Sequence, residues 1–376
     1  RFSSRRRHTR CSRWSRGLGD VYKRQCLHRG TMLRAPGTDG CASEFKCSFH
    51  GWSWNLDGSL KQALCDWDFP HVKAGEYALP QARVELLAGF VFINMDHGAP
   101  SLADYLGPEF MAHISQWGLE DRYTYCHVSK SLPANWKLSM AAFMEAYHVL
   151  DTHPQVAVSN ADANSQYDVY GEHVDRFIST LGVLSPHLKG QYTEQDILDQ
   201  FTLGDSSMAG EEPRKLAPGE TARQCMADMI RQAFESQGGA DLSRVSDSEL
   251  LDCFSYTLFP NTFLFPGISL PMVYRFRPDP NDHRRTIYEV FFLRPVPKDG
   301  SRPDPAEMVY LSDDQSFTEA EGMDPGFGAI LDQDTENLVL QQAGLEASAK
   351  PGITLGNYQE IRVRHFERAV DKYVRA

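Results

Sequence analysis

The sequence lacks any long apolar run. Its strongest apolar stretch, Leu86 to Met95, has the length of a β-strand, whereas a membrane-spanning helix needs about 18 or more consecutive apolar residues. A membrane span is therefore excluded. Disorder and a collagen-like repeat are excluded too, because 41% of the 376 residues are apolar, enough to bury a sizeable core. The length predicts about two domains.

Positive charge is in short supply beyond the start of the chain. Residues 1–25 hold nine Lys or Arg and one acid, a net charge of +8; the whole chain carries −12, which leaves −20 for residues 26–376. Such an arm is typical of nucleic-acid binding, of a transit peptide or of a segment foreign to the protein. No apolar segment of a secretory signal follows it, so we expect a cytoplasmic protein in a reducing compartment.

Helical periodicity is missing from the first part of the chain. From Cys26 to about Asp96, short runs of strand-forming residues alternate with turn signals such as Asp57-Gly58. This pattern predicts a small all-β unit. Residues 97–130 are predicted to be a connector.

The remainder predicts a mixed α and β domain. A helix is expected from Trp136 to His153, because apolar residues recur there at helical spacing and Pro154 follows. The polar stretch 203–248 is expected to be an inserted cover with one amphipathic segment at 222–234. Further strands, a loop and two helices are predicted at Phe254–Leu258, Leu270–Arg277, Thr286–Arg294, 298–325 (loop), Gly328–Leu345 and Tyr358–Val374. The expected fold class is α+β.

Four residues near the start form two Cys–His pairs. Cys26 and His28 make a C-x-H pair, Cys47 and His50 make a C-x-x-H pair, and 18 residues separate His28 from Cys47. Two thiolates and two imidazoles on paired loops suit either structural zinc or a Rieske [2Fe–2S] cluster, in which both Cys hold one iron and both His the other. The spacing alone leaves both metals open.

The flanks of these pairs carry a resemblance. His28-Arg-Gly30 and His50-Gly-Trp52, followed by Asp57-Gly58, closely resemble the Rieske domains of ring-hydroxylating oxygenases. The resemblance implies a [2Fe–2S] Rieske domain over residues 26–97. That domain would be truncated at its N-terminus, because the family has several dozen residues before its first cluster Cys. Residues 1–25 resemble translated sequencing-adapter read-through, and we expect them to be a non-native leader; a genuine nucleic-acid or targeting arm is the alternative.

A second group of metal-ligand types lies further along. Glu145 and His148 are three apart and would share a helix face, whereas His148 and His153 are five apart and need a bulge or a helix end between them. Two His and a distant carboxylate form the facial triad of non-haem Fe(II) oxygenases. Taken alone, two His near a helix end are usually structural.

This run resembles the iron-binding helix of Rieske oxygenase α subunits, with its E/D-x-x-H-x₄-H pattern. In that family the third ligand is an Asp three residues before an Asn, a rule that Asp334 meets with Asn337; Asp332 and Glu336 remain the alternatives. The resemblance also implies that Glu145 bridges a cluster His of one subunit to an iron His of the next. It therefore implies an α₃ or α₃β₃ ring.

The resemblance extends over about residues 26–376 and implies a helix-grip (START/Bet v1-like) catalytic domain at 98–376, with an antiparallel sheet. It implies a terminal oxygenase that uses O₂ and NAD(P)H-derived electrons, delivered by a reductase with or without a ferredoxin, to hydroxylate an aromatic or other small organic substrate. The alternatives are a quaternary-amine monooxygenase or oxidative demethylase of the same superfamily, a Rieske electron carrier and a ligand-binding helix-grip protein. No nucleic-acid or membrane partner is expected. The pocket candidates are Ala141, Ala142, Met144, Phe263, Phe265 and the 203–248 insertion.

Overall fold

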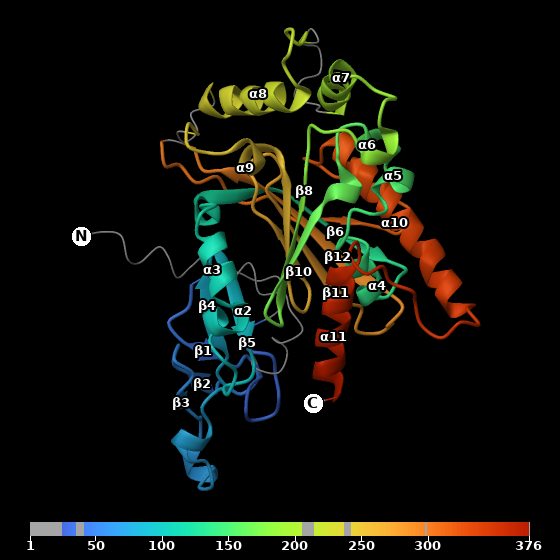
Figure 1. Cartoon of the computed structure of the whole chain (residues 1–376). Helices are drawn as coiled ribbons and strands as arrows, with labels where there is room; N and C mark the ends of the chain where they lie inside the picture. Colours follow the sequence, from blue (N-terminus) through green and yellow to red (C-terminus); the bar gives the residue numbers. More distant parts are fainter. Residues whose placement is uncertain (1–24, 35–40, 205–213, 237–241, 298, 376) are drawn as a thin grey trace. The chain divides into compact units, whose positions relative to one another are not determined.

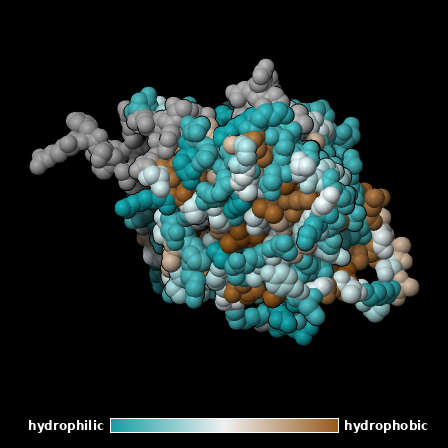
Figure 2. Space-filling view, turned by 45° about the horizontal axis from the view of Figure 1, so that its top comes forward, coloured by the Kyte–Doolittle hydropathy of each residue, from teal (hydrophilic) through white to brown (hydrophobic). Residues whose placement is uncertain are grey.

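The computed structural model describes residues 25–34, 41–204, 214–236, 242–297 and 299–375. The chain divides into two compact units, Arg1–Leu102 and Ala103–Ala376, which are described separately below (Figure 1). No described helix is long and apolar enough to cross a membrane. On the face that Figure 2 shows, polar residues predominate and apolar patches lie between them.

The first unit is built from short strands. β1, β2 and β3 form an antiparallel sheet, β4 and β5 form a hairpin, and η2 and η3 are single 3₁₀ turns. Trp52 and Trp54 are 2% and 0% exposed and form its core together with Cys26 and Cys47. The elements are β1 Phe45–Lys46, β2 Ser53–Trp54, β3 Leu60–Gln62, η2 Asp66–Asp68, η3 Ala74–Glu76, β4 Arg83–Leu87 and β5 Phe90–Asn94.

The second unit is organised around an eight-stranded sheet of order β13-β6-β12-β11-β10-β9-β8-β7. Every neighbouring pair is antiparallel except β13 with β6. The strands are β6 Arg122–Leu132, β7 Gln166–Tyr170, β8 Val174–Ser179, β9 Cys253–Leu258, β10 Thr262–Phe265, β11 Met272–Pro278, β12 Thr286–Pro295 and β13 Val309–Leu311.

Helices pack against this sheet. α4 contacts β11, β12 and α10, whereas α11 contacts β7 and β8 and runs beside the strands (Figure 1). The helices are α2 Leu102–Leu106, α3 Pro108–Ile114, α4 Trp136–Ala141, α5 Val149–Thr152, α6 Pro154–Ala157, α7 Glu194–Gly204, α8 Ala222–Ser236, α9 Asp247–Leu251, α10 Pro325–Glu346 and α11 Ile361–Arg375. Single 3₁₀ turns occur at η4 Leu119–Asp121, η5 Asp162–Asn164, η6 Pro186–Leu188 and η8 Phe317–Glu319. Mixed helices and a mainly antiparallel sheet confirm the predicted fold class.

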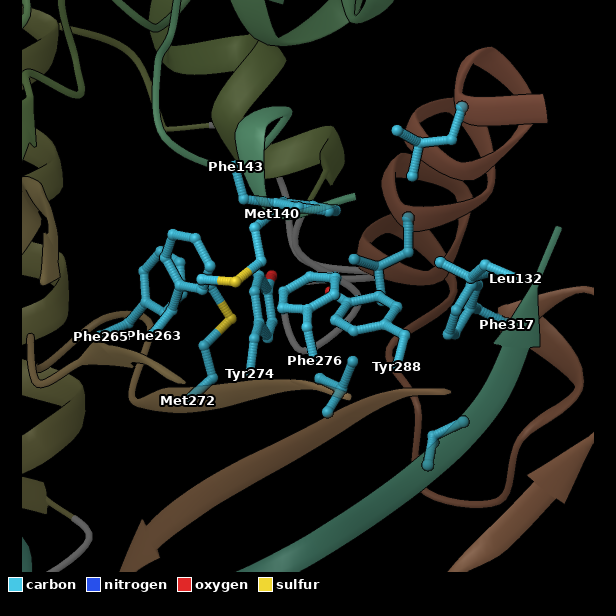
Figure 3. Packing of buried hydrophobic residues seen from close by; sticks show 14 of the residues in the cluster. Leu132, Met140, Phe143, Phe263, Phe265, Met272, Tyr274, Phe276, Tyr288 and Phe317 are labelled. Atoms are coloured by element: carbon cyan, nitrogen blue, oxygen red, sulfur yellow. The ribbon is translucent and has the colours of Figure 1, made fainter. Parts of the chain in front are cut away.

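An aromatic core fills the space between sheet and helices. The side chains of Tyr274, Phe276 and Tyr288 rise from β11 and β12 towards Met140 and Phe143 (Figure 3). The Phe276 and Tyr288 rings stack at 4.4 Å between centroids. Burying large rings at alternate strand positions stabilises the sheet and its helical cover together.

Three expectations about local structure were wrong. Residues 97–130 are no plain connector, because β6 pairs with β12 over its whole length; the buried Lys130 interrupts the apolar alternation that would have identified the strand. The helix expected at Trp136–His153 stops at Ala141 and resumes at Val149. The expected loop 298–325 contains β13 and η8.

The stretch expected to be a polar cover is an ordered helical subdomain where the structure describes it. α7, α8 and α9 lie beyond one end of the sheet (top in Figure 1). They enclose an apolar core of their own, with Leu198, Cys225, Met226 and Leu250 all at 0% exposure. The core residues of α8 lie along one face of an amphipathic helix, which matches the amphipathic segment expected at 222–234.

Candidate metal centres

The first centre consists of two matching turns in the first unit. Each begins at a buried Cys and ends at a Gly with positive φ: Gly30 N–H donates to Cys26 O at 2.8 Å, and Gly51 N–H donates to Cys47 O at 3.1 Å. Gly is needed at both ends because φ values of 80° and 72° disfavour other residues.

The two His complete this centre. The His28 and His50 rings lie 4.7 Å apart between centroids, and His28 stacks on Trp52 at 5.0 Å. The Nδ1 atom of His28 is buried and has no hydrogen-bond partner among the described residues. A buried ring nitrogen without a partner costs free energy unless a metal or a hydrogen-bond partner binds it. Two buried thiols, two neighbouring imidazoles and this unpaired nitrogen suit a [2Fe–2S] cluster.

The backbone of these turns also faces the sulfurs. Burial works against the thiolate of Cys47, but hydrogen bonds from the backbone N–H groups of Phe49 and His50 outweigh it and lower the pKa of Cys47. Burial raises the pKa of Cys26. Backbone donors around sulfur are a known means of tuning iron–sulfur sites.

The second centre lies in the second unit, where His148, His153 and Asp334 each offer a ligand atom within 4.8 Å of the others. Asp334 Oδ1 lies 2.9 Å from His153 Nε2 and 3.4 Å from His148 Nε2. His148 precedes the one-turn helix α5 and His153 follows it. His153 has a non-helical backbone where α5 ends and α6 begins, so two His that are five apart in the sequence can face the same point.

Acceptor side chains hold the opposite nitrogens of both His. Glu145 Oε1 lies 2.7 Å from His148 Nδ1, and Gln333 Oε1 lies 2.8 Å from His153 Nδ1. A carbonyl or carboxylate at Nδ1 fixes the tautomer that leaves Nε2 free for a metal. Both Nε2 atoms face Asp334. The set of two imidazoles and a carboxylate suits a non-haem Fe(II) ion.

The electrostatics of this centre favour a bound cation. Burial lowers the pKa of His148, but its hydrogen bonds to Asp334 and Glu145 outweigh burial and raise that pKa to about 10. Burial raises the pKa of Asp334, yet the two His lower it overall. Two carboxylates around His148 therefore stabilise positive charge, whether it resides on the imidazole or on a metal.

The alternative carboxylates face elsewhere. Asp332 accepts hydrogen bonds from Ser316 Oγ and, at 3.0 Å, from Phe317 N–H, so it anchors η8 to α10. Glu336 is exposed. Of the three acids, the structure brings Asp334 to the His pair. Gln333 was not among the predicted residues; its position next to Asp334 was the only signal.

A cavity of about 750 Å³ adjoins this centre, a volume within the range of small-molecule sites. Ala141, Ala142, Glu145, His148 and Asp334 line it, and among the residues that the structure describes the lining includes no Phe, Tyr or Trp and no residue of 203–248. The other pocket candidates lie in the aromatic core instead: the exposed fractions of Met144, Phe263 and Phe265 are 0%, 0% and 5%.

Two family models match the chain. Residues 111–376 match the ring hydroxylating alpha subunit (catalytic domain), and residues 13–69 match the Rieske [2Fe-2S] domain. The second match begins inside the segment 1–25 that we expected to be non-native; residues 1–24 lie outside the described part of the chain.

Curated relatives resemble part of the chain. The carnitine monooxygenase oxygenase subunit of Acinetobacter pittii (strain PHEA-2) is 36% identical over 137 residues, which is 36% of either chain. Chlorobenzene dioxygenase subunit alpha of Cupriavidus sp. (strain PS12) is 36% identical over 137 residues, 35% of this chain and 30% of the relative. The matched segment thus spans about a third of these relatives.

Solved structures share the fold. A quaternary ammonium Rieske monooxygenase superposes with a TM-score of 0.58 at 18% identity, covering 93% of this chain and 77% of the other. Naphthalene 1,2-dioxygenase with bound indole gives 0.54 at 19% identity, covering 94% and 78%.

Proposed function

Because the chain belongs to the ring-hydroxylating α-subunit family, we propose that it is the terminal oxygenase component of a Rieske non-haem iron system. The observation that carries this proposal is the convergence of His148, His153 and Asp334 in a chain that also has a Cys₂His₂ centre. A pure electron carrier has no use for that convergence, and a ligand-binding protein has no use for either centre.

Each centre would hold one group. The [2Fe–2S] cluster would be held by Cys26, Cys47, His28 and His50. Fe(II) would be held by the triad of His148, His153 and Asp334. When bound, the two groups supply one-electron transfer and the activation of O₂. The electrons would come from NAD(P)H through a reductase, with or without a ferredoxin. A cytoplasmic location and the lack of a nucleic-acid or membrane partner belong to the same proposal.

The protein's own residues would orient and shield the iron centre. Glu145 and Gln333 hold the two imidazoles by their Nδ1 atoms. His153 and Asp334 are 4% and 6% exposed, which keeps bulk water from most of the site. His148 is the more open ligand, because it lines the cavity.

Glu145 would also carry the electron path between subunits, in an α₃ or α₃β₃ ring. Its support is geometric: Glu145 contacts His148 and lines the same open cavity, so a partner's cluster His could approach it. Glu145→Gln keeps the shape and removes the charge. We expect both metal centres to stay loaded while electron transfer in a single turnover slows at least about tenfold; an unchanged transfer rate contradicts the bridge.

The substrate proposed is an aromatic or other small organic compound. A quaternary-amine monooxygenase or oxidative demethylase remains the second candidate, favoured by the similarity to carnitine monooxygenase subunits. Cages for quaternary ammonium groups are built from Phe, Tyr and Trp side chains, and the described residues that line the cavity beside the triad include none of these. This difference favours the first candidate over a quaternary-amine monooxygenase.

Two measurements test the function. The reconstituted chain should contain about three iron atoms and two sulfides; a chain that takes up only zinc contradicts the proposal, and two irons indicate a carrier. A panel of arenes, aromatic acids and quaternary amines is then tested with a surrogate reductase, NADH and ¹⁸O₂. We expect an ¹⁸O-labelled product from an arene or an aromatic acid. Release of formaldehyde or trimethylamine during turnover would favour the second candidate.

A further inference from the structure

The turn Ala142–His148, between α4 and α5, carries Glu145 and His148 but has few backbone partners of its own. Phe143 N–H and Met144 N–H still donate to carbonyls of the preceding turn, at 3.0 and 3.1 Å. Beyond Met144 the helical ladder ends, and side chains from distant elements bind the backbone on both sides of Glu145. An irregular segment keeps one conformation only where surrounding groups satisfy its backbone.

Arg362 of α11 binds the first of these backbone groups. Its Nη1 donates to Met144 O at 3.2 Å, its Nε to Asp175 Oδ1 at 2.6 Å and its Nη2 to Thr257 Oγ1 at 2.5 Å. The side chain is 0% exposed, and its Cζ lies 4.8 Å from the centre of the Phe177 ring. One guanidinium thus joins α11, β8 and β9 to the metal-bearing turn.

Tyr167 of β7 binds the second group. Its hydroxyl accepts the Ala146 N–H at 3.0 Å and donates to Gln359 Oε1 at 3.1 Å. Gln359 in turn donates to Ala163 O at 3.0 Å. The carbonyl before Glu145 and the N–H after it are therefore both fixed by side chains that are buried in the fold.

We propose that Arg362 and Tyr167 are positioning residues that set the geometry of His148 and Glu145 by clamping the backbone at Met144 and Ala146. The proposal rests on the proposed iron site. Neither residue lies on the lining of the cavity, so each acts through the turn. A guanidinium suits the task because its planar fork supplies three separate contacts, which an ammonium on a flexible stem does not.

The test uses the cluster-loaded protein and Co(II) as a probe of the triad, with Asp334→Ala as the blank. Tyr167→Phe removes the acceptor of Ala146 N–H, and we expect Co(II) affinity to fall about tenfold, with a changed Co(II) d–d spectrum. The matched control is Tyr256→Phe, because Tyr256 is 1% exposed on β9, two strands from β7 in the same sheet, and its hydroxyl contacts Arg176 instead. The control should stay within about twofold of wild type, and an unchanged affinity in Tyr167→Phe overturns the proposal.

A second pair of variants separates positioning from stability. Arg362→Met and Arg223→Met each remove a cation from a largely buried acid, Asp175 or Asp252, and both should lower Tm. We expect Arg223→Met to keep the Co(II) spectrum of the wild type and Arg362→Met to change it. Arg362→Lys should show a changed spectrum as well, because lysine does not supply the three contacts of the guanidinium. Equal Tm losses with identical wild-type spectra overturn the clamp. A wild type that binds no more Co(II) than Asp334→Ala overturns the iron site itself, which distinguishes the two failures.

Discussion

The two proposed metal centres are built in different ways. The Cys₂His₂ centre comes from two short turns within residues 26–50, each closed by its own backbone hydrogen bonds and a Gly of positive φ. The second centre needs α10 to bring Asp334 to His153, 181 residues earlier. The first site is a matter of local turn chemistry, and the second depends on the whole sheet and its helices.

This difference determines what supports each site. The cluster turns need the small core around Trp52 and Trp54. The triad needs α10 against α4, and it needs side chains such as Arg362 that connect the last helix to the turn before α5. Changes in the second unit should therefore spare the cluster, and changes in the cluster turns should spare the triad.

The largest expected effect comes from Asp334→Ala. It removes the carboxylate from the triad, so iron should fall from about three to about two atoms per chain while the visible cluster spectrum stays. Metal analysis and absorption spectra measure both. Glu336→Ala, an exposed acid on the same helix, is the control and should keep full iron. Full iron in Asp334→Ala would show that another group is the third ligand.

The reverse experiment is Cys47→Ser. It should abolish the cluster spectrum, because a serine hydroxyl is a poor substitute for a buried thiolate, while mononuclear iron still binds in the second unit. Cys41→Ser changes an exposed free cysteine between the two pairs and should leave the spectrum intact. Loss of iron from the triad in Cys47→Ser would contradict the independence of the two centres.

The same contrast explains what the sequence could predict. The cluster site was recognisable because its ligands and its required glycines lie within one short stretch. The three triad residues could be named only through the family resemblance. Spacing alone left Asp332 and Glu336 open, since all three acids lie on one helix and only the packing of α10 decides which one faces His153.

Supporting groups were beyond prediction for a physical reason. Each of Arg362, Tyr167 and Gln333 reaches the site through one hydrogen bond, to Met144 O, Ala146 N–H or His153 Nδ1. These partners are distant in the sequence, and no periodicity marks such contacts. The same holds for β6, whose alternation is broken at Lys130, a buried cation held by Gln315 O and the Phe317 ring. The start of helix α10 was predicted within three residues, at Gly328 where the structure has Pro325.

A smaller effect is expected from Gln333→Leu. The variant removes the acceptor at His153 Nδ1 without touching a ligand atom, so Fe(II) affinity should fall by about 10- to 100-fold. Titration of the iron-depleted triad in cluster-loaded protein measures it. Gln191→Leu makes the same exchange at an exposed position of the second unit that is not on the lining of the cavity, and it should have no effect. Equal affinities in both variants would mean that His153 needs no partner at Nδ1.

The smallest effect on the metal centres is expected from a change at Glu289, in the sheet that supports the triad. Glu289 on β12 is 2% exposed, and Arg275 and Arg277 contact it at 2.6 and 3.2 Å. Burial raises its pKa, but the imidazole of His127, whose Nε2 lies 3.9 Å from Glu289 Oε1, and the two Arg outweigh burial and lower the pKa of Glu289 to about 2. Its contribution is therefore present above its ordinary pKa of 4.5 and is lost as the pH falls from there through about 2.

Glu289→Gln tests this contribution. We expect a loss on the order of 3 kcal/mol at pH 7, with a flatter decline of stability below pH 4.5 than in the wild type. Denaturant unfolding at several pH values measures both, while metal content at pH 7 should stay unchanged at either centre. Glu172→Gln, which breaks an exposed pair with Lys372, should not alter stability measurably. Release of the triad iron with an unchanged free energy of unfolding would contradict this prediction. It would mean that Glu289 acts on the iron centre directly and not by stabilising the second unit.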